Sequence, residues 1–322
     1  MKRSLIVAAA LASVGISAYA QSSVNLYGRV NITLERQELT NGKTVNVMQN
    51  NSSRWGLRGK EDLGGGMVTG FILESGFNPT NGTAQSSFFG RQSELNLTSG
   101  YGMVRLGNFL SEAYEASADY VGMHNHETGT SQDAFYAYLG RNTSKVAYRT
   151  PSFSGTTVEG SVTKGGTENR TYDLAANYDA GPLHLGAGYE KNSPSNKNAK
   201  EFSVRALYEL GAFTFGGYVQ RDTDGWGKGL GDRTSLRLVG MYALGATEFH
   251  LNYGRAGKYG NGNAINGALE TNQFTLGVNQ NLSKRTKVYA FYTKLTGKGD
   301  TFYANNNFGL TSSLAVGVRH NF

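Results

Sequence analysis

Residues 310 to 322, LTSSLAVGVRHNF, alternate between apolar and polar side chains up to the last residue of the chain. Because neighbouring side chains of a strand point to opposite faces, Leu314, Val316 and Val318 share one face, whereas Gly317 and Arg319 share the other. One face suits lipid and the other suits water, as in a strand of a transmembrane barrel. The stretch therefore predicts a membrane strand that ends on an aromatic residue.

The first twenty residues carry the features of a secretory signal peptide. A pair of positive charges precedes an apolar run, which leads to the small-residue cleavage signal Ala18-Tyr19-Ala20. The apolar run is shorter than the ~20 residues that a spanning helix needs, and no comparable run follows. We therefore predict a signal peptide at 1–20, a single mature domain at 21–322, and membrane insertion by strands.

The composition suits a chain of many strands punctuated by glycine. The 322 residues include 44 Gly, 19 Tyr and 16 Phe but no Cys, which excludes a disulfide framework and a thiolate metal site. Without Lys2 and Arg3, 29 basic residues remain against 24 acidic ones, a net charge of +5. A nucleic-acid binder would use such a surplus to attract phosphates, but the export signal favours handling of anions or contact with lipopolysaccharide.

Sixteen strand-like segments follow one another along the mature chain, with no break in composition that would divide it into domains. In the first segment, apolar residues from Val24 to Leu34 alternate with polar residues from Asn25 to Glu35. The same pattern recurs at residues 172–178, 183–189, 202–208, 213–219, 236–242, 249–253 and 274–278. Bacterial barrels have even strand numbers. The sequence therefore predicts an all-β fold, a 16-stranded antiparallel transmembrane β-barrel.

The connections between these segments alternate in length. Short turns should face the periplasm and long loops the outside of the cell. A soluble sandwich or propeller also alternates apolar and polar residues, so the connection lengths and the terminal strand favour the membrane barrel. Short turn signals lie at 64–66, 99–100, 151–155, 180–182 and 211, and longer polar stretches at 192–199, 222–232 and 257–272.

One connection is much longer than the others. Roughly thirty residues without sustained strand alternation separate Asn108 from Asn142, and loops of this length are usually functional or disordered. Folded inward, this third external loop would narrow the lumen and set its carboxylates against the opposite wall. The alternative is an exposed acidic loop on the cell surface. The loop carries Glu112, Glu115, Asp119, Glu127 and Asp133.

Alternation also sorts the basic residues of the strands. If Trp55 and Leu57 face outward, Arg54 and Arg58 face the lumen. An arginine facing lipid at mid-bilayer would cost ~2 to 4 kcal/mol, which favours the inward orientation. The same rule assigns further basic residues to lumen faces: Arg29, Arg105, Arg141, Lys145 and Arg149.

Arg91 is assigned to the same basic wall, on a strand that we expect at residues 89–97. The opposite face of that strand would then carry Gln92, Glu94 and Asn96. This face is too polar for lipid. It would suit contact with another subunit.

The longest motif of the chain, SRWGLRGKEDLGGG at 53–66, lies within a series of shorter ones. They are VNLYG at 24–28, LESGF at 73–77, FGRQ at 89–92, LG at 106–107 and VGVRHNF at 316–322. In this order they resemble the general porins of beta-proteobacteria, Gram-negative outer-membrane diffusion porins, and the resemblance covers essentially the whole mature chain. It implies a trimeric sixteen-stranded barrel, an inward-folded third external loop that forms the constriction, and passive diffusion of small hydrophilic solutes.

The resemblance also implies which residues line the constriction. Two departures from the family's usual pattern, Arg29 and Arg105, make this lumen more positive. The last residue, Phe322, resembles the family's assembly signal, so its removal should impair insertion without changing selectivity. The basic cluster falls on Arg54 or Arg58, Arg91 and Arg141, and its acidic counterpart on Glu112, Glu115 and Asp119.

The predicted function is therefore a water-filled outer-membrane channel for ions and small hydrophilic solutes that prefers anions, because arginines on one wall enrich anions. A substrate-specific channel for small organic or inorganic anions is the alternative, and an adhesin with a closed lumen is a second one. The expected partners are two further copies in a homotrimer, outer-membrane lipid, lipopolysaccharide and small anions. No nucleic-acid partner is expected.

Enzymatic readings have little support in the sequence. His184 and His250 lie on separate strand segments without a nucleophile motif, and no phosphate-binding loop opens a helix. His124 and His126 are spaced to share a strand face and suggest a divalent-ion site, but histidines in a polar loop are more often solvated. We expect no enzymatic activity, no cofactor and no metal.

Overall fold

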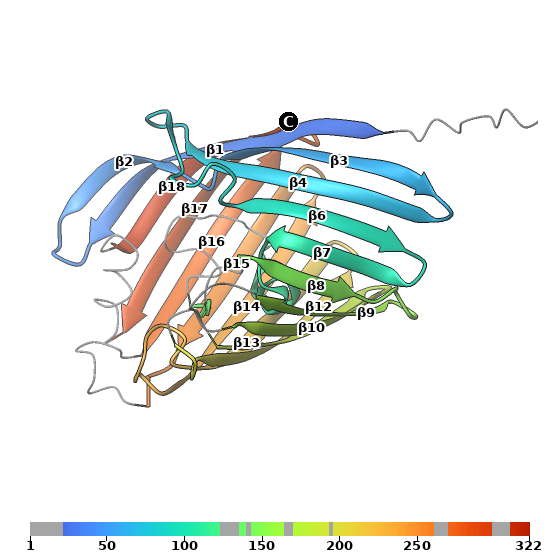
Figure 1. Cartoon of the computed structure of the whole chain (residues 1–322). Helices are drawn as coiled ribbons and strands as arrows, with labels where there is room; N and C mark the ends of the chain where they lie inside the picture. The colour runs from blue at the N-terminus through green and yellow to red at the C-terminus, as the bar shows by residue number, and fades with distance from the viewer. Residues whose placement is uncertain are drawn as a thin grey trace, which may run out of the picture.

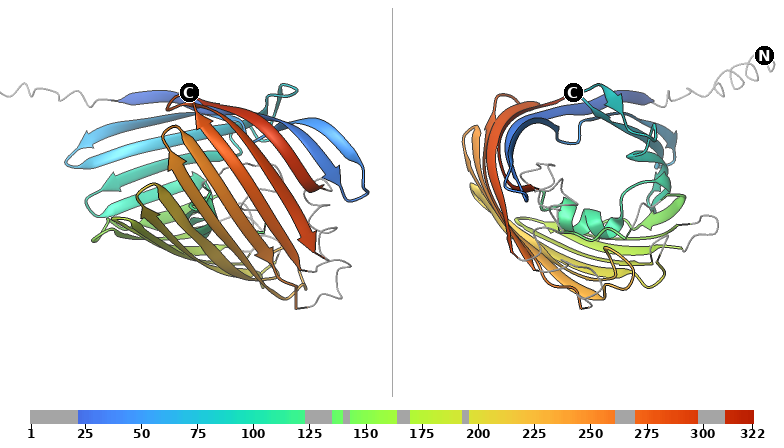
Figure 2. Two further views of the ribbon diagram at one scale, coloured as in Figure 1. Left: turned by 180° about the vertical axis from the view of Figure 1, so that it is seen from behind. Right: turned by 90° about the vertical axis from the view of Figure 1, so that its left-hand side faces the viewer.

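The computed structural model describes residues 22–122, 135–139, 143–163, 170–192, 196–260, 270–297 and 310–322. In these residues the chain forms one antiparallel sheet that closes into a barrel (Figure 1; Figure 2, right). The all-β barrel predicted from the sequence is confirmed. Within the same residues, no helix is long and apolar enough to cross a membrane.

Sixteen strands build the wall, which confirms the number read from the sequence. A bulge divides one of them into β2 and β3, and the two-residue β5 pairs only with the end of β4. The strands are β1 (Ser23–Leu39), β2 (Thr44–Asn50), β3 (Arg54–Gly64), β4 (Met67–Asn78), β5 (Thr83–Ala84), β6 (Gln92–Ser99), β7 (Gly102–Asn108), β8 (Lys145–Arg149), β9 (Thr156–Thr163), β10 (Tyr172–Ala180), β11 (Leu183–Lys191), β12 (Lys200–Leu210), β13 (Phe213–Thr223), β14 (Asp232–Leu244), β15 (Thr247–Ala256), β16 (Thr271–Asn281), β17 (Thr286–Gly297) and β18 (Leu310–Asn321).

The barrel closes between its first and last strands. β18 pairs with β1 from Arg29 opposite Asn321 to Leu39 opposite Leu310. Phe322 extends this seam with two backbone hydrogen bonds to Gly28, with N–O distances of 3.0 and 3.1 Å. The alternation of the terminal residues thus predicted the strand, and closure of the barrel gives it the first strand as its partner.

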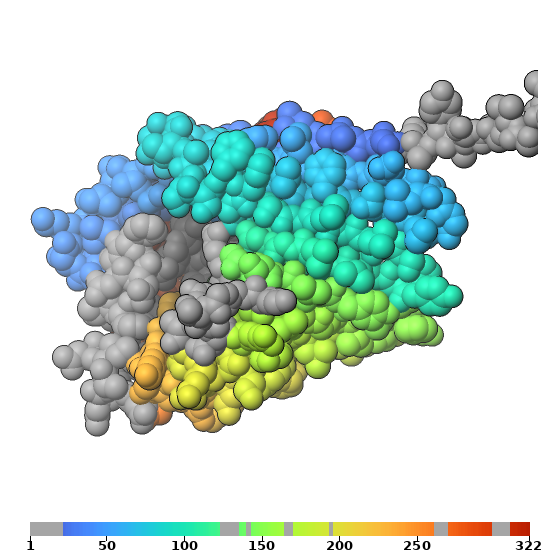
Figure 3. Space-filling view, viewed as in Figure 1, coloured from blue at the N-terminus to red at the C-terminus, as the bar shows by residue number. Residues whose placement is uncertain are grey.

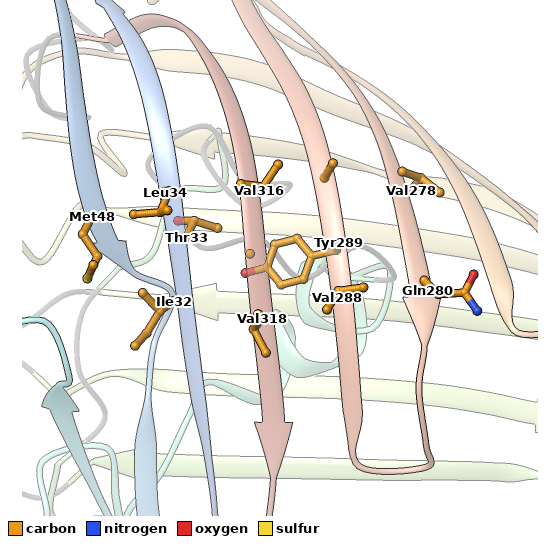
Figure 4. A pocket seen from close by; sticks show the side chains of 12 residues that line it. Ile32, Thr33, Leu34, Met48, Val278, Gln280, Val288, Tyr289, Val316 and Val318 are labelled. Carbon is orange, nitrogen blue, oxygen red and sulfur yellow. The ribbon is translucent and has the colours of Figure 1, made fainter.

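The outer face of the barrel is apolar. Leu314, Val316 and Val318 of β18 are each more than half exposed, and they alternate with inward-facing residues. Figure 4 shows part of this face, where Val316 and Val318 border a shallow groove of about 690 Å³ together with Ile32 and Met48. The strands form a continuous outer surface from β1 to β9 (Figure 3). Such a face suits a hydrocarbon environment.

The inner face of the barrel is polar, the reverse of a soluble β-protein. Along β1, Asn31, Thr33, Glu35 and Gln37 are almost fully buried, whereas Leu34 between them is 56% exposed. Buried polar groups must be hydrogen-bonded, and here they bind one another: Thr33 and Gln37 both donate to Glu35, at 2.5 and 2.9 Å. The hydrophilic lumen follows directly from the period-two pattern of the strands.

The two ends of the barrel differ as the sequence predicted. At one end, two-residue connections join β10 to β11, β12 to β13 and β14 to β15, with Gly181, Gly211 and Gly245 each at a φ of 60°. This left-handed conformation is accessible to glycine without strain, which suits tight hairpins. The opposite end carries the longer connections. The third of them, residues 109–144, is the long loop singled out above.

Our interpretation of residues 89–97 was wrong. Leu95 of β6 is 55% exposed and faces outward, so Gln92, Glu94 and Asn96 face the lumen. Arg91 precedes β6, and strand alternation therefore does not apply to it; its side chain also reaches inward. The three polar residues belong to the lumen lining. They do not form a subunit contact.

Candidate functional site: the barrel lumen

One side of the lumen carries the arginines that the sequence indicated. Arg54 on β3 and Arg91 before β6 lie on either side of Glu74 of β4, with Nε–Oε distances of 3.5 and 2.7 Å. Tyr27 donates a further hydrogen bond to the same carboxylate, at 3.1 Å. Both arginine side chains keep about a quarter of their surface exposed. One carboxylate therefore serves two accessible guanidinium groups, which leaves a positive surplus.

Arg29 and Arg58 extend this surface. A bulge at residues 51–53 separates β2 from β3, and Ser52 in it has a left-handed φ of 51°. The bulge turns two carbonyls toward Arg29, whose Nε lies 3.1 Å from the Ser52 oxygen and whose Nη2 lies 3.4 Å from that of Asn51. These carbonyls carry no net charge. Arg58 is exposed, with its guanidinium 5.0 Å from the centre of the Tyr27 ring.

We call Arg29, Arg54, Arg58 and Arg91 the basic wall. They come from β1, β3 and the residue before β6, and in the sheet β1 lies next to β3, with β4 between β3 and β6. All four side chains lie on the lumen side.

Arg105 also lies on the inner face, but in a different environment. Its guanidinium binds Glu94 through two nitrogens, at 3.1 and 2.8 Å, and Glu159 through a third, at 2.8 Å. The group also stacks on Phe109, 4.0 Å from the ring centre. Only 5% of Arg105 is exposed. Its charge is therefore neutralised within the wall.

The start of the long connection is anchored to the inner wall. Its helical turns α2 (Glu112–Tyr114) and η1 (Glu115–Asp119) lie inside the barrel against β9 to β12 (Figure 2, right). Asp173 of β10 accepts hydrogen bonds from the backbone N–H groups of Glu112 and Ala113, at 2.8 and 3.0 Å. A carboxylate at this position caps the first turn and complements its dipole. Gly188 of β11 permits the close approach, because a Cβ there would lie 2.4 Å from Ala113 Cα.

The three loop carboxylates indicated by the sequence differ in accessibility. Glu112 is buried, with Oε2 2.6 Å from Lys145 Nζ and 2.8 Å from the Ser161 hydroxyl. Glu115 is about one-third exposed and lies 3.9 Å from Arg105. Asp119 is exposed. Only Glu115 and Asp119 are therefore placed to act on a passing ion.

The carboxyl group of Glu115 has a raised pKa. Burial raises its pKa to about 7, with the carboxylates of Glu112, Asp119 and Glu159 adding to the rise and Arg105 opposing it. The charge on this part of the loop therefore changes near neutral pH.

Two further contacts hold the loop to the wall. The Tyr120 hydroxyl lies 2.6 Å from Asp179 Oδ1 and 2.9 Å from His184 Nδ1, and the Arg205 guanidinium lies 3.4 Å from the centre of its ring. Residues 135–139, near the end of the connection, form a second attachment.

That second attachment uses the inner faces of β12 to β14. The side chain of Gln220 accepts from the backbone N–H of Ala137 and donates to its carbonyl, at 2.8 and 3.1 Å. Tyr136 donates to Glu201 at 3.0 Å, and Arg233 donates to the carbonyl of Phe135 at 2.9 Å. Both described parts of the connection thus contact β9 to β14, which lie opposite β1 to β4 in the closed sheet, and Figure 2 (right) shows the helical turns on that side.

The comparison with known sequences decides the family. A profile of the family described as Gram-negative porin matches residues 5–300. The chain belongs to this family. Outer membrane porin protein 32 of Delftia acidovorans is 28% identical and an outer membrane porin protein of Bordetella pertussis is 26% identical, in both cases over the full length of both chains.

A solved structure agrees with this assignment. The anion-selective porin from Comamonas acidovorans has a TM-score of 0.77 to this chain at 25% identity, covering 94% of this chain and 100% of that one. The protein is an outer-membrane porin, whose polar lumen is a channel for passive diffusion of ions and small hydrophilic solutes. The resemblance read from the motifs is confirmed. Its fold and family are those of a channel.

We call the inner faces of β6 to β14, together with the described loop residues that they hold, the loop-bearing wall. Sequence reasoning missed how acidic this wall is. Alternation had placed Arg105, Lys145 and Arg149 inward and suggested a strongly positive wall. Each is paired with a carboxylate: Lys145 with Glu112, which we had assigned to the constriction, and Arg105 and Arg149 with Glu159, which we had not assigned to the lumen. The sequence did contain a signal for Glu94 and Glu159, because both carboxylates alternate with apolar residues in their own strands. The inward acidic residues of this wall include Glu94, Glu159, Asp173, Glu190, Glu201 and Asp222.

Some residues singled out in the sequence lie outside the described parts of the porin. They are Arg141 of the basic cluster, the loop carboxylates Glu127 and Asp133, and the two loop histidines, His124 and His126. The proposed signal peptide at 1–20 also lies outside them. Among the residues that the structure describes, no group of three or more His, Cys, Asp or Glu side chains is arranged to hold a metal ion.

Proposed function

We propose that this porin prefers small anions over cations and that the basic wall sets this preference. The observation that carries the proposal is the gathering of four arginines on the inner face near β1 to β4, where Arg54 and Arg91 share the carboxylate of Glu74, Arg29 binds backbone carbonyls and Arg58 lies beside the Tyr27 ring. Fixed positive charge along a water-filled path raises the local concentration of anions. Arginine remains charged at any working pH, so the preference should not depend on deprotonation of the wall.

The opposite wall should oppose this selectivity only weakly. Its carboxylates could offset the arginines, but most of them are committed to buried partners. Glu94 and Glu159 bind Arg105, and Glu112 binds Lys145. The accessible negative charge of the described loop residues is limited to Glu115 and Asp119.

The long connection at 109–144 should act as the constriction. Its described parts, residues 109–122 and 135–139, contact the inner faces of β9 to β14, so these parts would narrow the lumen on the side away from the arginines. Solutes would then pass between the loop and the basic wall, across a transverse field. Arg141 would add to this field, as the family resemblance implies.

Similarity to the anion-selective porin from Comamonas acidovorans supports the preference. From the family resemblance we further propose a homotrimer in contact with outer-membrane lipid and lipopolysaccharide, exported with a cleaved signal peptide at 1–20 and assembled through Phe322. We assign it no catalytic activity. A band of trimer size that dissociates on heating in a denaturing gel would support the assembly.

The selectivity is tested by the reversal potential of the purified porin in a planar bilayer under a potassium chloride gradient. The expected sign is that of an anion-preferring channel. In the triple variant Arg54→Gln, Arg58→Gln, Arg91→Gln, the ratio of chloride to potassium permeability should fall several-fold, by about 1 kcal/mol in free-energy terms.

A matched control removes the same number of charges from the outer face. Arg36, Arg221 and Arg255 lie at outward-facing positions, and their replacement by Gln should leave the reversal potential unchanged. A cation preference of the wild-type porin would refute the proposal. Equal shifts in the two triple variants would show that the basic wall does not control selectivity.

A further inference from the structure

A second basic site lies at the turn-side mouth of the barrel, away from the long loops. A cavity of about 350 Å³ opens there near the ends of β14 to β18. Four of its ten lining residues are basic, and none belongs to the basic wall: Lys284, Arg285, Lys287 and Arg319. Its volume lies in the range of small-molecule sites.

The strand register explains why these charges gather. Lys287 of β17 pairs directly with Arg319 of β18, so both side chains point to the same, inner face. Like charges at directly opposed positions of a sheet are destabilising. A protein that keeps such a pair in its lumen therefore has a reason to bind a counter-ion between the two side chains.

The turn between β16 and β17 adds two more charges in a fixed geometry. The hydroxyl of Ser283 accepts hydrogen bonds from the backbone N–H groups of Arg285 and Thr286, at 3.1 and 3.0 Å. The carbonyl of Arg285 accepts from the backbone N–H of Asn321, at 2.7 Å, which ties the turn to the end of β18. Lys284 and Arg285 are thus held at the rim of the cavity.

The lining contains one carboxylate, Glu248, and this group already accepts hydrogen bonds from neighbouring side chains. Its Oε1 accepts from Asn281 at 2.7 Å, and its Oε2 accepts from Asn279 at 2.9 Å and lies 3.3 Å from His250 Nε2. The backbone oxygen of Phe322, next to the end of β18, accepts the hydrogen bond from the N–H of Gly28. The cavity therefore retains a strong positive surplus.

We propose that this cavity is a binding site for a small multivalent oxyanion, such as phosphate. Lys287 and Arg319 bind the anion from the two strands, while Lys284 and Arg285 attract it from the rim. Arginine and lysine together offer the donor geometry and point charge that such anions take. Asn281, Ser283 and Thr286 supply further polar groups around it.

The proposal deepens the proposed function, because it requires an open channel whose lumen anions can enter. The site would hold an anion near one mouth of the channel, so occupancy should reduce chloride current in a saturable way. Because the cavity lies at the turn side, anion added to that compartment should act at lower concentration than anion added to the other.

Inorganic phosphate is the probe. Chloride current through single wild-type porins in a planar bilayer is recorded while phosphate is added to either compartment, and the half-blocking concentration is determined. In the double variant Lys287→Gln, Arg319→Gln this concentration should rise about tenfold, as expected for loss of two charged donors. The variant Lys287→Arg, which preserves the charge, should remain within about twofold of wild type.

Lys60→Gln serves as the matched control. Lys60 lies at the turn-side end of β3, and it does not line the cavity. Its replacement should leave phosphate block unchanged, and gel mobility before and after heating shows that each variant has folded.

The outcomes separate this inference from the proposed function. Absence of saturable phosphate block in a normally conducting, anion-preferring wild type would refute the site alone. Block that survives in the double variant but disappears in the basic-wall triple variant would place the anion at the constriction and refute the site. A cation-preferring wild type that still shows block sensitive to Lys287 and Arg319 would refute only the proposed selectivity.

Discussion

The two sides of the lumen use similar residues in opposite ways. On the basic wall, Arg54 and Arg91 share a single carboxylate and keep part of their surface in the channel. On the loop-bearing wall, Arg105 and Lys145 are buried in pairs and networks with carboxylates. Both sets face inward, and both were predicted to do so from strand alternation.

The difference shows that orientation alone does not make a charge functional in a channel. An arginine with two buried carboxylate partners carries no net field into the lumen, but its removal leaves those partners unpaired. An exposed arginine contributes little to stability, but its charge reaches the solvent. We therefore expect stability effects on the loop-bearing wall and selectivity effects on the basic wall.

The largest effect is expected for Arg105→Ala. The substitution leaves Glu94 and Glu159 buried without their common partner, which should lower the free energy of unfolding by about 3 to 5 kcal/mol. Urea unfolding of the refolded barrel measures the change. Arg58→Ala on the basic wall is the control and should change stability by less than about 0.5 kcal/mol. Similar losses in both variants would contradict the division between the two walls.

Asp173→Ala should loosen the start of the loop. The carboxylate accepts two backbone hydrogen bonds from α2, and their loss should weaken the attachment by about 1 to 3 kcal/mol. Single-channel recordings should then show additional conductance levels, because the segment moves against the wall. Asp62→Ala, which removes a carboxylate that caps only its own turn at Gly64, should leave the recordings unchanged. If recordings of the Asp173 variant showed no additional conductance levels, other contacts would hold the loop in place.

A change of pH should alter selectivity through Glu115. Because its pKa is raised to about 7, the carboxyl group is largely neutral at pH 6 and largely charged at pH 8. Raising the pH therefore adds negative charge to the lumen, and the ratio of chloride to potassium permeability should fall. Reversal potentials at the two pH values measure this step, which should disappear in Glu115→Gln. A step of the same size in that variant would assign the titration to another group.

The smallest effect is expected for Tyr120→Phe. The substitution removes the hydroxyl contacts with Asp179 and His184 but keeps the ring on which Arg205 stacks. Partly exposed contacts of this kind contribute about 0.2 to 1 kcal/mol. We expect a slight rise in current noise and no change in mean conductance or reversal potential. A clear change in mean conductance would show that this contact sets the position of the loop.

Much of the fold could be predicted because strand alternation is a local property. The alternation in residues 24–35 and 310–322 predicted the first and last strands, which the structure confirms and shows to be paired with each other. The error at Glu94 arose where a local rule was extended too far. Arg91 was assumed to lie within the strand, but β6 begins at Gln92, and this reversed every face assigned after it.

The candidate site could be predicted only in part. Strand alternation placed Arg29, Arg54, Arg58 and Arg105 in the lumen. It could not show that, of these four, only Arg105 is enclosed by carboxylates. Those partners, Glu94 and Glu159, come from strands on either side of β7 and β8, so their distances depend on how the whole sheet closes. The role of the constriction residues stays a prediction.

By itself, the sequence determined a barrel of sixteen strands with a polar lining and an apolar outer surface. The reason is that the alternation of residues within each strand sets which side chains face inward and which face outward. Tertiary structure decided which charges remain available to a solute. That outcome depends on the register between strands and on where the long loop rests. The loop brings Glu112 to Lys145, and the strand register brings Lys287 to Arg319, although the members of each pair are far apart in the chain. Electrostatic compensation acts over a few ångströms in space, and such proximity is not encoded in any local pattern.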